Sequence, residues 1–250
     1  MNSQKTLIEA VNIKKSFGNL HTLEDVTLSL EKNQFVSILG PSGCGKSTLF
    51  NVISGLELPD RGNIIIDSKN YNGKTGRVSY MHQKDLLFPW NNIIGNVSLS
   101  LLIKGWNKKK AQTEAKKYFT DFGLKGFEKS YPSQLSGGMR QRAALLRTYL
   151  FANDIMLLDE PFGSLDAITR RKMQLWLLEV WERIEASILF ITHDIDEAIF
   201  LSDKIYLLSR RPAVVREIFN VEIKRPRDNR TFTSIEFNRI KEKIIILLET

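Results

Sequence analysis

The sequence has very little cysteine, no internal repeat and no low-complexity linker. One cysteine, Cys44, stands among 250 residues. A single thiol cannot close a disulfide within the chain, which excludes a disulfide-based scaffold and fits a reducing cytosol. Charged residues make up 26% of the chain without forming a long block of one sign, which argues against intrinsic disorder.

A secretion signal and a clean membrane-spanning run are also missing. Residues 1–17 lack the apolar core of a secretion signal. The stretch 86–103 has no formal charge and approaches spanning length, but it contains Pro89 and three asparagines, which would be costly in lipid. We therefore expect this stretch to be an apolar part of a water-soluble domain.

The sequence does have enough apolar residues for a full-sized core, and an excess of positive charge. Hydrophobic residues make up 42% of the chain, which suits one full-sized domain or a core with a small inserted subdomain. The formal net charge of +8 is compatible with nucleic acid, an anionic membrane surface or a phosphorylated ligand. Charge alone does not choose among these partners.

Short apolar runs alternate with helical patterns along the chain. The runs at 155–158 and 188–191 are continuously apolar, as in parallel strands that are buried on both faces. Strands separated by helices predict an α/β layered fold. The other expected elements are strands at 35–39, 64–66 and 78–81, helices at 47–56, 108–122 and 231–248, and two strands of an antiparallel side sheet within 7–30.

A glycine-rich segment, GPSGCGKST, lies between an expected strand and an expected helix. Glycines let successive backbone N–H groups turn inward around an anion, and the following helix points its positive end at the same place. This is the phosphate-binding loop pattern in its required context, so we expect Lys46 to contact the β- and γ-phosphates of ATP and Ser47 to bind Mg²⁺. The predicted loop residues are Gly40, Pro41, Ser42, Gly43, Cys44, Gly45, Lys46, Ser47 and Thr48.

Two acidic residues, Asp159 and Glu160, end the apolar run 155–158. A buried parallel strand can deliver carboxylates to the edge of the sheet where ligands collect. There, Asp159 would support Mg²⁺ through water, and Glu160 would polarise the water that attacks the nucleotide. Taken alone, the pair is equally well a solvated strand end, but the phosphate-binding loop favours the catalytic interpretation.

The segment LSGGMRQR at 135–142 resembles the signature motif of ABC (ATP-binding cassette) ATPases, and it lies just before the Asp-Glu strand, as in that family. Ser136 and the N–H groups of Gly137 and Gly138 would form a second anion site at a helix start. The resemblance implies that this site meets the γ-phosphate held by the opposite subunit. Ser136 would also cap the helix.

The other family positions follow in order, and the resemblance covers about residues 7–218. By resemblance, Gln83 senses Mg²⁺ and the attacking water, and His193 contacts the γ-phosphate. Asp166 belongs to a loop that crosses between subunits. Phe17 sits where the family carries an aromatic residue, often tyrosine, that stacks on adenine, and phenylalanine keeps that stacking face. The implied catalytic group is Glu160, His193 and Gln83, and the implied Mg²⁺ ligands are Ser47, Gln83 and Asp159.

The resemblance implies the ABC form of the P-loop NTPase fold, with a mainly parallel core sheet, an N-terminal antiparallel β subdomain and an inserted helical subdomain. Residues 1–250 would form one domain, with a core at 7–83 and 153–220, a helical subdomain at 84–152, and a tail at 221–250. We expect about one strand and one helix beyond residue 218. His21 and His82 are given no chemistry.

Cassettes without spanning helices resemble the ATPase subunits of bacterial importers, which work in pairs. The resemblance therefore implies a homodimer, integral membrane permease subunits, an external solute-binding protein, no nucleic acid, and a position on the cytoplasmic face of the inner membrane. In the family, the region after Gln83 borders a groove for a coupling helix of the membrane subunit. Phe88 and Trp90 would dock that helix if they are exposed, or would belong to the helical core if they are not.

The LFPW segment at 87–90, SRRP at 209–212 and Pro226-Arg227 together resemble the nitrate, sulfonate and taurine importer group. That group also includes transporters for the pyrimidine precursor of thiamine. Two other classes stay open. One is an ABC ATPase that acts on nucleic acid or ribosomes, although such proteins usually carry two cassettes or long coiled-coil insertions. The other is an exporter ATPase.

Overall fold

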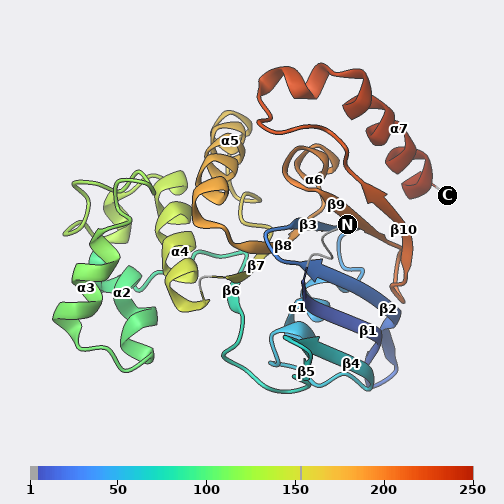
Figure 1. Ribbon diagram of the computed structural model, residues 1–250, viewed down its shortest axis with the longest axis horizontal. Coiled ribbons are helices and arrows are strands. Elements are labelled where there is room, and N and C mark those ends of the chain that lie inside the picture. The colour runs from blue at the N-terminus through green and yellow to red at the C-terminus, as the bar shows by residue number, and fades with distance from the viewer. Residues whose placement is uncertain (1–4, 153, 250) are drawn as a thin grey trace. The chain divides into compact units, whose positions relative to one another are not determined.

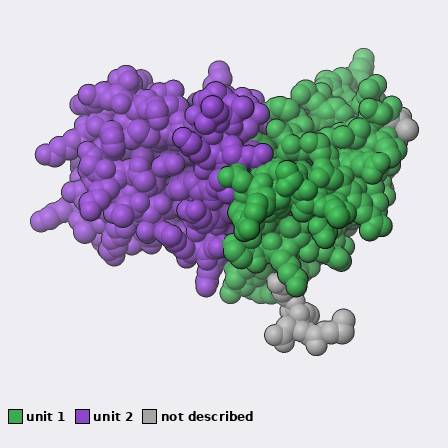
Figure 2. Space-filling model, turned by 90° about the horizontal axis from the view of Figure 1, so that it is seen from above, with its two compact units in different colours: residues 1–77, 186–250 green, residues 78–185 purple. Residues whose placement is uncertain are grey.

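The computed structural model describes residues 5–152 and 154–249, which form two compact units. Unit 1 comprises residues 1–77 and 186–250, and unit 2 comprises residues 78–185 (Figure 2). Unit 2 is continuous in sequence and interrupts unit 1. The segment predicted as a helical subdomain, 84–152, falls inside unit 2. Positions 153 and 250, at which predicted segments begin or end, lie outside the described residues.

Unit 1 carries the predicted antiparallel side sheet and part of the predicted parallel sheet. Its strands are β1 (Thr6–Phe17), β2 (Leu20–Glu31), β3 (Phe35–Leu39), β4 (Arg61–Ile66), β5 (Lys69–Asn70), β8 (Ser187–Thr192), β9 (Lys204–Leu208) and β10 (Val215–Asn220). Its helices are α1 (Lys46–Ile53), α6 (Ile195–Leu201), the 3₁₀ helix η2 (Asn229–Thr233) and α7 (Ile235–Glu249).

The side sheet has the strand order β2-β1-β4-β5, and all of its pairs are antiparallel. Its buried residues alternate with exposed ones along β2, as expected for a sheet with one face on the core. The two strands expected within 7–30 are therefore confirmed, and together they extend from Thr6 to Glu31, one residue beyond that range at each end.

The central strand of unit 1 is β3, which pairs in parallel with both β8 and β9. All five residues of β3 and all six of β8 are buried, which explains their unbroken apolar pattern. Because Leu39 pairs with Thr192, both strands end at the same edge of the sheet. The chain segments that follow these strands, from Gly40 and from His193, therefore start side by side.

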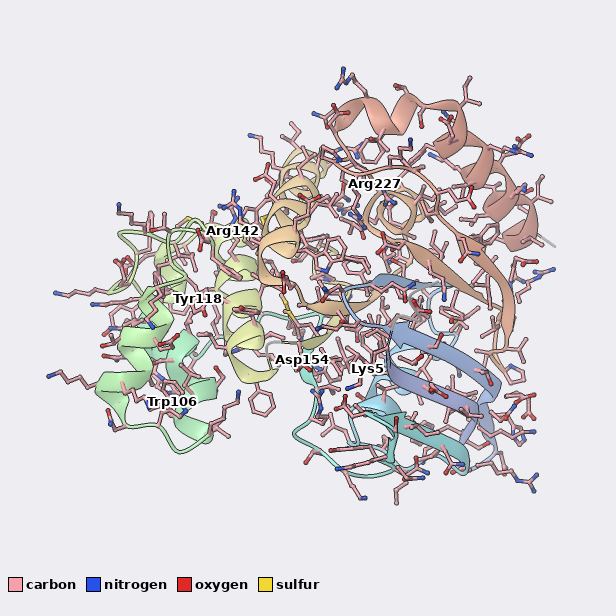
Figure 3. The ribbon with its side chains drawn as sticks, viewed as in Figure 1. Lys5, Trp106, Tyr118, Arg142, Asp154 and Arg227 are labelled. Carbon is pink, nitrogen blue, oxygen red and sulfur yellow. The ribbon has the colours of Figure 1, made fainter. Side chains whose placement is uncertain are left out.

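The C-terminal segment of unit 1 is fastened to α6 by a buried arginine, Arg227 (labelled in Figure 3). Its guanidinium donates to the carbonyl oxygens of Ile199, Phe200 and Ser202 at 2.8–3.1 Å, and to that of Ile223. Carbonyls at a helix end have no partner within the helix, so the arginine caps α6. Burial lowers the pKa of this guanidinium to about 10.

Two further contacts hold the tail on α6. The Phe232 ring stacks on Phe200 with 4.3 Å between ring centroids, and Lys241 of α7 forms a 2.7 Å ion pair with Asp196. In Figure 1, α7 accordingly lies beside α6. Residues 221–228 form no strand, so the strand expected beyond residue 218 is only the end of β10. The expected closing helix is present as α7.

Unit 2 contains mostly helices around one short parallel pair of strands. Its elements are β6 (Ser79–Met81), α2 (Ile93–Ile103), α3 (Lys108–Lys116), the 3₁₀ helix η1 (Pro132–Gln134), α4 (Gly137–Ala152), β7 (Ile155–Asp159) and α5 (Ala167–Ile184). β6 pairs with β7 in parallel, and Met81 lies opposite Leu158. Gln83 and the acids Asp159 and Glu160 therefore follow the same edge of this pair.

The helix expected over 108–122 was too long, since α3 ends at Lys116. From there the hydrogen bonds tighten: Tyr118 N–H donates to Ala115 and Phe119 N–H to Lys116, three residues back instead of four. This tightening turns Phe119 into the core, where it is buried.

The uncharged stretch 86–103 contains a loop followed by α2, which packs against α4. Among the described residues, no helix is both long enough and apolar enough to cross a membrane. The α/β architecture with an antiparallel N-terminal sheet, a mainly parallel core and a helical insert is thus confirmed.

Candidate nucleotide-binding site

The loop between β3 and α1 has the backbone shape that its glycines predict. Gly43 and Gly45 adopt positive φ angles of 73° and 123°, which side chains other than glycine rarely allow. A Cβ atom on Gly45 would also lie 2.9 Å from side-chain atoms of Thr22 and Leu23 on β2. The loop is therefore shaped by its own sequence and pressed closely against β2.

Lys46, the first residue of α1, folds back over this loop. Its ammonium group donates to the carbonyl oxygens of Gly40 at 2.8 Å and Pro41 at 2.9 Å, and the residue is only 5% exposed. Ser47, one residue later, is exposed. The loop therefore places one buried cation and a hydroxyl at the start of a helix, where the backbone N–H groups favour phosphate anions.

Cys44 is a buried part of the same loop, with 2% of its surface exposed. Burial raises the pKa of its thiol above the ordinary value. The thiol is therefore held in its neutral form, which fits a packing role for this side chain.

Phe17 ends β1 and leaves 45% of its surface exposed. The Lys15 ammonium lies 5.0 Å from the centroid of its ring. An exposed aromatic face beside a cation is suited to stacking on a nucleobase.

His193 follows β8 in a turn that is fixed by hydrogen bonds among Thr192, Asp194 and Glu197. Thr192 Oγ1 donates to the buried carboxylate of Glu197 at 2.7 Å, and it accepts from the Asp194 N–H at 3.0 Å. Asp194 in turn caps α6 by accepting from the Glu197 N–H at 3.1 Å. The turn therefore presents the exposed His193 from a rigid base, at the sheet edge where the phosphate-binding loop also begins.

In unit 2, Asp159 ends β7 and is 6% exposed. The Tyr80 hydroxyl donates to its Oδ2 atom at 3.2 Å. Burial, together with the neighbouring Asp159 carboxylate, raises the pKa of Tyr80, so this tyrosine stays a hydrogen-bond donor. The contact fixes the orientation of the carboxylate.

Glu160, the next residue, has a φ angle of 44°, a left-handed conformation that is unusual for glutamate. Its Oε2 atom accepts from the Gln83 amide nitrogen at 3.3 Å. Strained backbone of this kind is found most often at functional sites. The structure therefore brings two of the three predicted catalytic residues of this chain into direct contact within unit 2.

The predicted signature segment starts α4. Ser136 Oγ accepts from the Met139 N–H at 3.3 Å, which confirms that it caps the helix. A Cβ atom on Gly137 would lie 3.3 Å from Leu165, and one on Gly138 would lie 3.3 Å from Thr169. The glycines therefore allow close packing of this helix start on the neighbouring segment.

Asp166 lies in that neighbouring segment, where it caps α5. Its Oδ1 atom accepts from the N–H groups of Ile168 at 3.1 Å and Thr169 at 3.0 Å. The hydrogen bonds from Thr169 hold the pKa of this carboxyl below its usual range. Asp166 is exposed, so it is open to a partner as well.

Phe88 and Trp90 form a pair of stacked rings, with 5.0 Å between centroids and 10° between planes. Trp90 is 72% exposed, and Phe88 is half-buried. This exposure agrees with the docking alternative and disagrees with a core position for Trp90.

Sequence reasoning missed the residues that hold this aromatic loop. The buried Asn96 side chain accepts from the Phe88 N–H at 2.6 Å and donates to three carbonyl oxygens of the loop. Arg147 of α4 donates to the carbonyls of Asp85 and Leu86. Tyr80, which holds Asp159, was missed as well. No local pattern marks such residues, because their partners lie far away in sequence or on the backbone.

Comparison with known proteins identifies the family of this chain. The family model described as ABC transporter matches residues 23–163. The aliphatic sulfonates import ATP-binding protein SsuB of Bacillus thuringiensis subsp. konkukian is 39% identical over 231 residues, which cover 92% of this chain and 90% of that protein. The formylaminopyrimidine import ATP-binding protein ThiZ of Halalkalibacterium halodurans is 46% identical over 190 residues, which cover 76% and 74%.

Solved structures agree as well. A dimeric structure of MJ0796, a bacterial ABC transporter cassette, matches with a TM-score of 0.74 at 29% identity, covering 87% of this chain and all of that one. A dimeric post-hydrolysis state of the same cassette, bound to ADP and phosphate, matches with a TM-score of 0.73. The chain belongs to the ABC transporter family, and it is an ATP-binding subunit that hydrolyses ATP.

Proposed function

We propose that this subunit powers a bacterial importer for a small solute of the sulfonate, nitrate or taurine kind, or for a pyrimidine precursor of thiamine. Two relatives named for import of such solutes, SsuB and ThiZ, support this assignment. The observation that carries it is the exposed Phe88–Trp90 pair, which offers a membrane partner an apolar surface close in sequence to Gln83. The choice of solute belongs to the membrane and external binding subunits.

In unit 1, residues Gly40–Thr48 would hold the triphosphate and Phe17 would stack on adenine. The Lys46 ammonium now bonds to two loop carbonyls, and phosphate oxygens would take over part of that contact. His193, held by the turn behind it, would contact the γ-phosphate and report its presence to α6.

Mg²⁺ would be held by the Ser47 hydroxyl, the Gln83 amide oxygen and the Asp159 carboxylate. This set consists of hard oxygen donors, which suit Mg²⁺. Among the described residues, no group of three or more His, Cys, Asp and Glu side chains could hold a metal ion. This fits an ion that is bound by one carboxylate together with substrate phosphates. When bound, Mg²⁺ neutralises charge on the phosphate oxygens.

Glu160 would act as the general base for hydrolysis. Its carboxylate is oriented by the Gln83 amide, and a carboxylate so placed can accept the proton of an attacking water. Release of ADP and phosphate would then complete the cycle. Gln83 would couple that step to the loop that carries Phe88 and Trp90, because the loop follows Gln83 in sequence.

A second copy of the chain would complete each ATP site. The capped start of α4, with Ser136, Gly137 and Gly138, would bind the γ-phosphate that is held by the other copy. Asp166 would lie at the boundary between the copies. The dimeric structures of the MJ0796 cassette support pairing.

Partners outside the pair would be two integral membrane permease subunits and an external solute-binding protein, with the cassettes on the cytoplasmic face of the inner membrane. Phe88 and Trp90 would anchor a coupling helix of the permease. Truncating an aromatic anchor costs on the order of 2 kcal/mol or more at an interface. Because Trp90 is exposed, its loss should leave the isolated fold nearly unaffected.

The test is Trp90→Ala in a cell that also makes the tagged permease. We expect a folded subunit that binds ATP normally and a permease that recovers at least about tenfold less of it, since 1.4 kcal/mol corresponds to a factor of ten. Trp106→Ala, another tryptophan of unit 2, serves as the control. Undiminished recovery of Trp90→Ala would reject docking at this pair.

Proteoliposomes that contain the assembled transporter then identify the class of solute. ATP-dependent uptake of an alkanesulfonate or of a formylaminopyrimidine would choose between the two importer types. Efflux instead of uptake would identify an exporter. Salt-sensitive nucleic-acid binding with no permease recovered would favour the soluble ATPase class.

A further inference from the structure

We propose that Arg211 is a positioning residue for nucleotide binding, which fixes one peptide group of the phosphate-binding loop from outside. The inference rests on the proposed function, in which Gly40–Thr48 hold the triphosphate. Arg211 lies in the turn between β9 and β10, 168 positions away from the residue that it contacts. It would touch the loop and not the nucleotide.

The guanidinium of Arg211 forms both of its hydrogen bonds to the phosphate-binding loop with one atom, the carbonyl oxygen of Gly43. Its Nε atom donates to the Gly43 carbonyl at 3.1 Å, and its Nη2 atom donates to the same oxygen. A planar guanidinium with two donors on one acceptor restrains direction as well as distance. The Gly43 carbonyl is therefore held in one direction, toward Arg211.

The orientation of the Gly43 carbonyl decides where the next N–H points. The peptide group is planar and trans, so its C=O and N–H bonds point in opposite directions. The Cys44 N–H does face inward, since it donates to the Pro41 carbonyl across the loop at 3.3 Å. Fixing the direction of Gly43 O thus also fixes the direction of the Cys44 N–H, within the loop that would hold the phosphates.

The loop needs such a restraint because of its glycines. Gly43 has the φ angle of 73° that the turn requires, but glycine also has the greatest freedom to leave that conformation. A Cβ atom there would meet the Arg211 guanidinium at 3.5 Å and nothing closer. The two hydrogen bonds from Arg211 to Gly43, called the clamp below, restrict the loop before ATP binds. The loop therefore loses less conformational entropy when it orders around a phosphate.

The turn that carries Arg211 is itself held in place by hydrogen bonds. Ala213, two residues further along the same turn, pairs with β2 through two backbone hydrogen bonds, from Ala213 N–H to the Thr22 carbonyl at 2.9 Å and from Glu24 N–H to the Ala213 carbonyl at 2.8 Å. Ser209 closes the same turn by accepting from the Val214 N–H at 3.0 Å. β2 in turn contacts the phosphate-binding loop at Gly45, so turn, strand and loop form one connected frame.

The neighbouring Arg210 provides a matched control. It is exposed, lies in the same turn and carries the same charge. If Arg211 helped only as a nearby positive charge, removing either arginine should weaken ATP binding to a similar extent, and Arg211→Lys should bind like the native chain. If it acts as a clamp, the two sites should differ, because lysine cannot reproduce the two-donor geometry.

The experiment measures ATP affinity by calorimetry for Arg211→Ala, Arg211→Lys, Arg210→Ala and Lys46→Ala, together with the Tm of each. We expect Arg211→Ala to weaken binding about fivefold, the value of one hydrogen bond of about 1 kcal/mol, with kcat at saturating ATP unchanged. Arg211→Lys should fall between Arg211→Ala and the native chain, and Arg210→Ala should change affinity less than twofold.

A second readout follows the loop directly. Cys44 is the one cysteine of the chain and is buried in the loop, so its rate of labelling by a thiol reagent reports loop opening. Arg211→Ala should raise that rate about fivefold by the same arithmetic, and Arg210→Ala should not. If Arg211→Ala lowers the Tm strongly, Arg211→Lys takes its place in both measurements.

Equal losses of affinity in Arg210→Ala and Arg211→Ala, or native affinity and labelling in Arg211→Ala, would overturn the inference. Lys46→Ala separates it from the proposed site. Native ATP affinity in Lys46→Ala would reject the site itself. Weak binding in Lys46→Ala with native binding in Arg211→Ala would reject the clamp alone.

Discussion

The two units build their parts of the site in different ways. In unit 1 the phosphate-binding loop is mostly backbone, shaped by glycines with positive φ angles and closed by Lys46 on two carbonyls. In unit 2 the groups that would act on the nucleotide are side chains held by other side chains, with Tyr80 on Asp159 and Gln83 on Glu160. A backbone loop suits a constant task such as binding phosphate, whereas a hydrogen-bonded side-chain pair can form and break during turnover.

This comparison implies that binding and turnover separate along the chain. Substitutions in the loop of unit 1 should change affinity for ATP, and substitutions in the side-chain pairs of unit 2 should change rate or assembly. Four substitutions, two of them with an expected effect of about 100-fold, test that separation.

Glu160→Gln should lower steady-state turnover at least about 100-fold, the usual contribution of a general base, while ATP affinity stays native. The amide keeps the size of the carboxylate but cannot accept the proton. ATP should then trap a dimer, visible by light scattering. Glu182→Gln, an exposed glutamate of α5, is the control. Hydrolysis at a near-native rate would remove Glu160 from the mechanism.

Lys46→Ala should weaken ATP binding about 100-fold. It removes the two expected charge-assisted contacts to the β- and γ-phosphates, which are worth roughly 3 kcal/mol together. Titration calorimetry measures the affinity, and circular dichroism checks that the variant is folded. Lys32→Ala, an exposed lysine of the same unit, should bind ATP normally. A folded Lys46→Ala with native affinity contradicts the phosphate-binding assignment.

Asn96→Ala should lower the free energy of unfolding by about 2 kcal/mol, because the Phe88 N–H and the loop carbonyls lose a buried partner. Chemical denaturation gives the value, and Trp90 fluorescence should show a looser loop. ATP affinity should stay native, since the damage lies in unit 2. Asn107→Ala, at the exposed cap of α3, should cost clearly less. Equal costs would mean that Asn96 does not organise the loop.

Gly137→Asp should leave ATP binding by the single chain intact and weaken ATP-driven dimerisation at least about tenfold, since its carboxylate would face a γ-phosphate of like charge. Gly137→Ala is the matched control. It adds the same Cβ atom, 3.3 Å from Leu165, without the charge. Both chains would carry Glu160→Gln so that the dimer persists. Equal loss in the two variants would assign the effect to packing against Leu165.

The parts that the sequence predicted well are those whose geometry is encoded locally. The spacing of Gly43, Gly45 and Lys46 after an apolar strand is sufficient to predict the loop, because each residue acts on its own stretch of backbone. The same holds for Ser136, which caps the helix α4 that follows it. Continuous apolar runs likewise predicted β7 and β8, since both strands are wholly buried.

Residues that act at a distance could not be predicted in this way. Asn96 and Arg147 hold the aromatic loop through its backbone carbonyls, and a carbonyl carries no sequence information. Arg211 reaches a loop that lies 168 positions earlier. The end of α3 was placed too late for a related reason. The tightened backbone after Lys116 turns Phe119 into the core, and that burial depends on the surroundings of Phe119 in the fold.

The interruption of unit 1 by unit 2 has a consequence for how the chain is made. A chain leaves the ribosome from its N-terminus, and units fold as they are completed. Unit 2 is complete at residue 185, but β3 still has neither of its parallel partners, β8 and β9, which end at residues 192 and 208. The phosphate-binding loop is therefore synthesised early, but the sheet that positions it is completed late. A nascent chain gains the ability to hold ATP only after residue 208 has been synthesised, so nucleotide binding marks a chain in which both parts of unit 1 have come together.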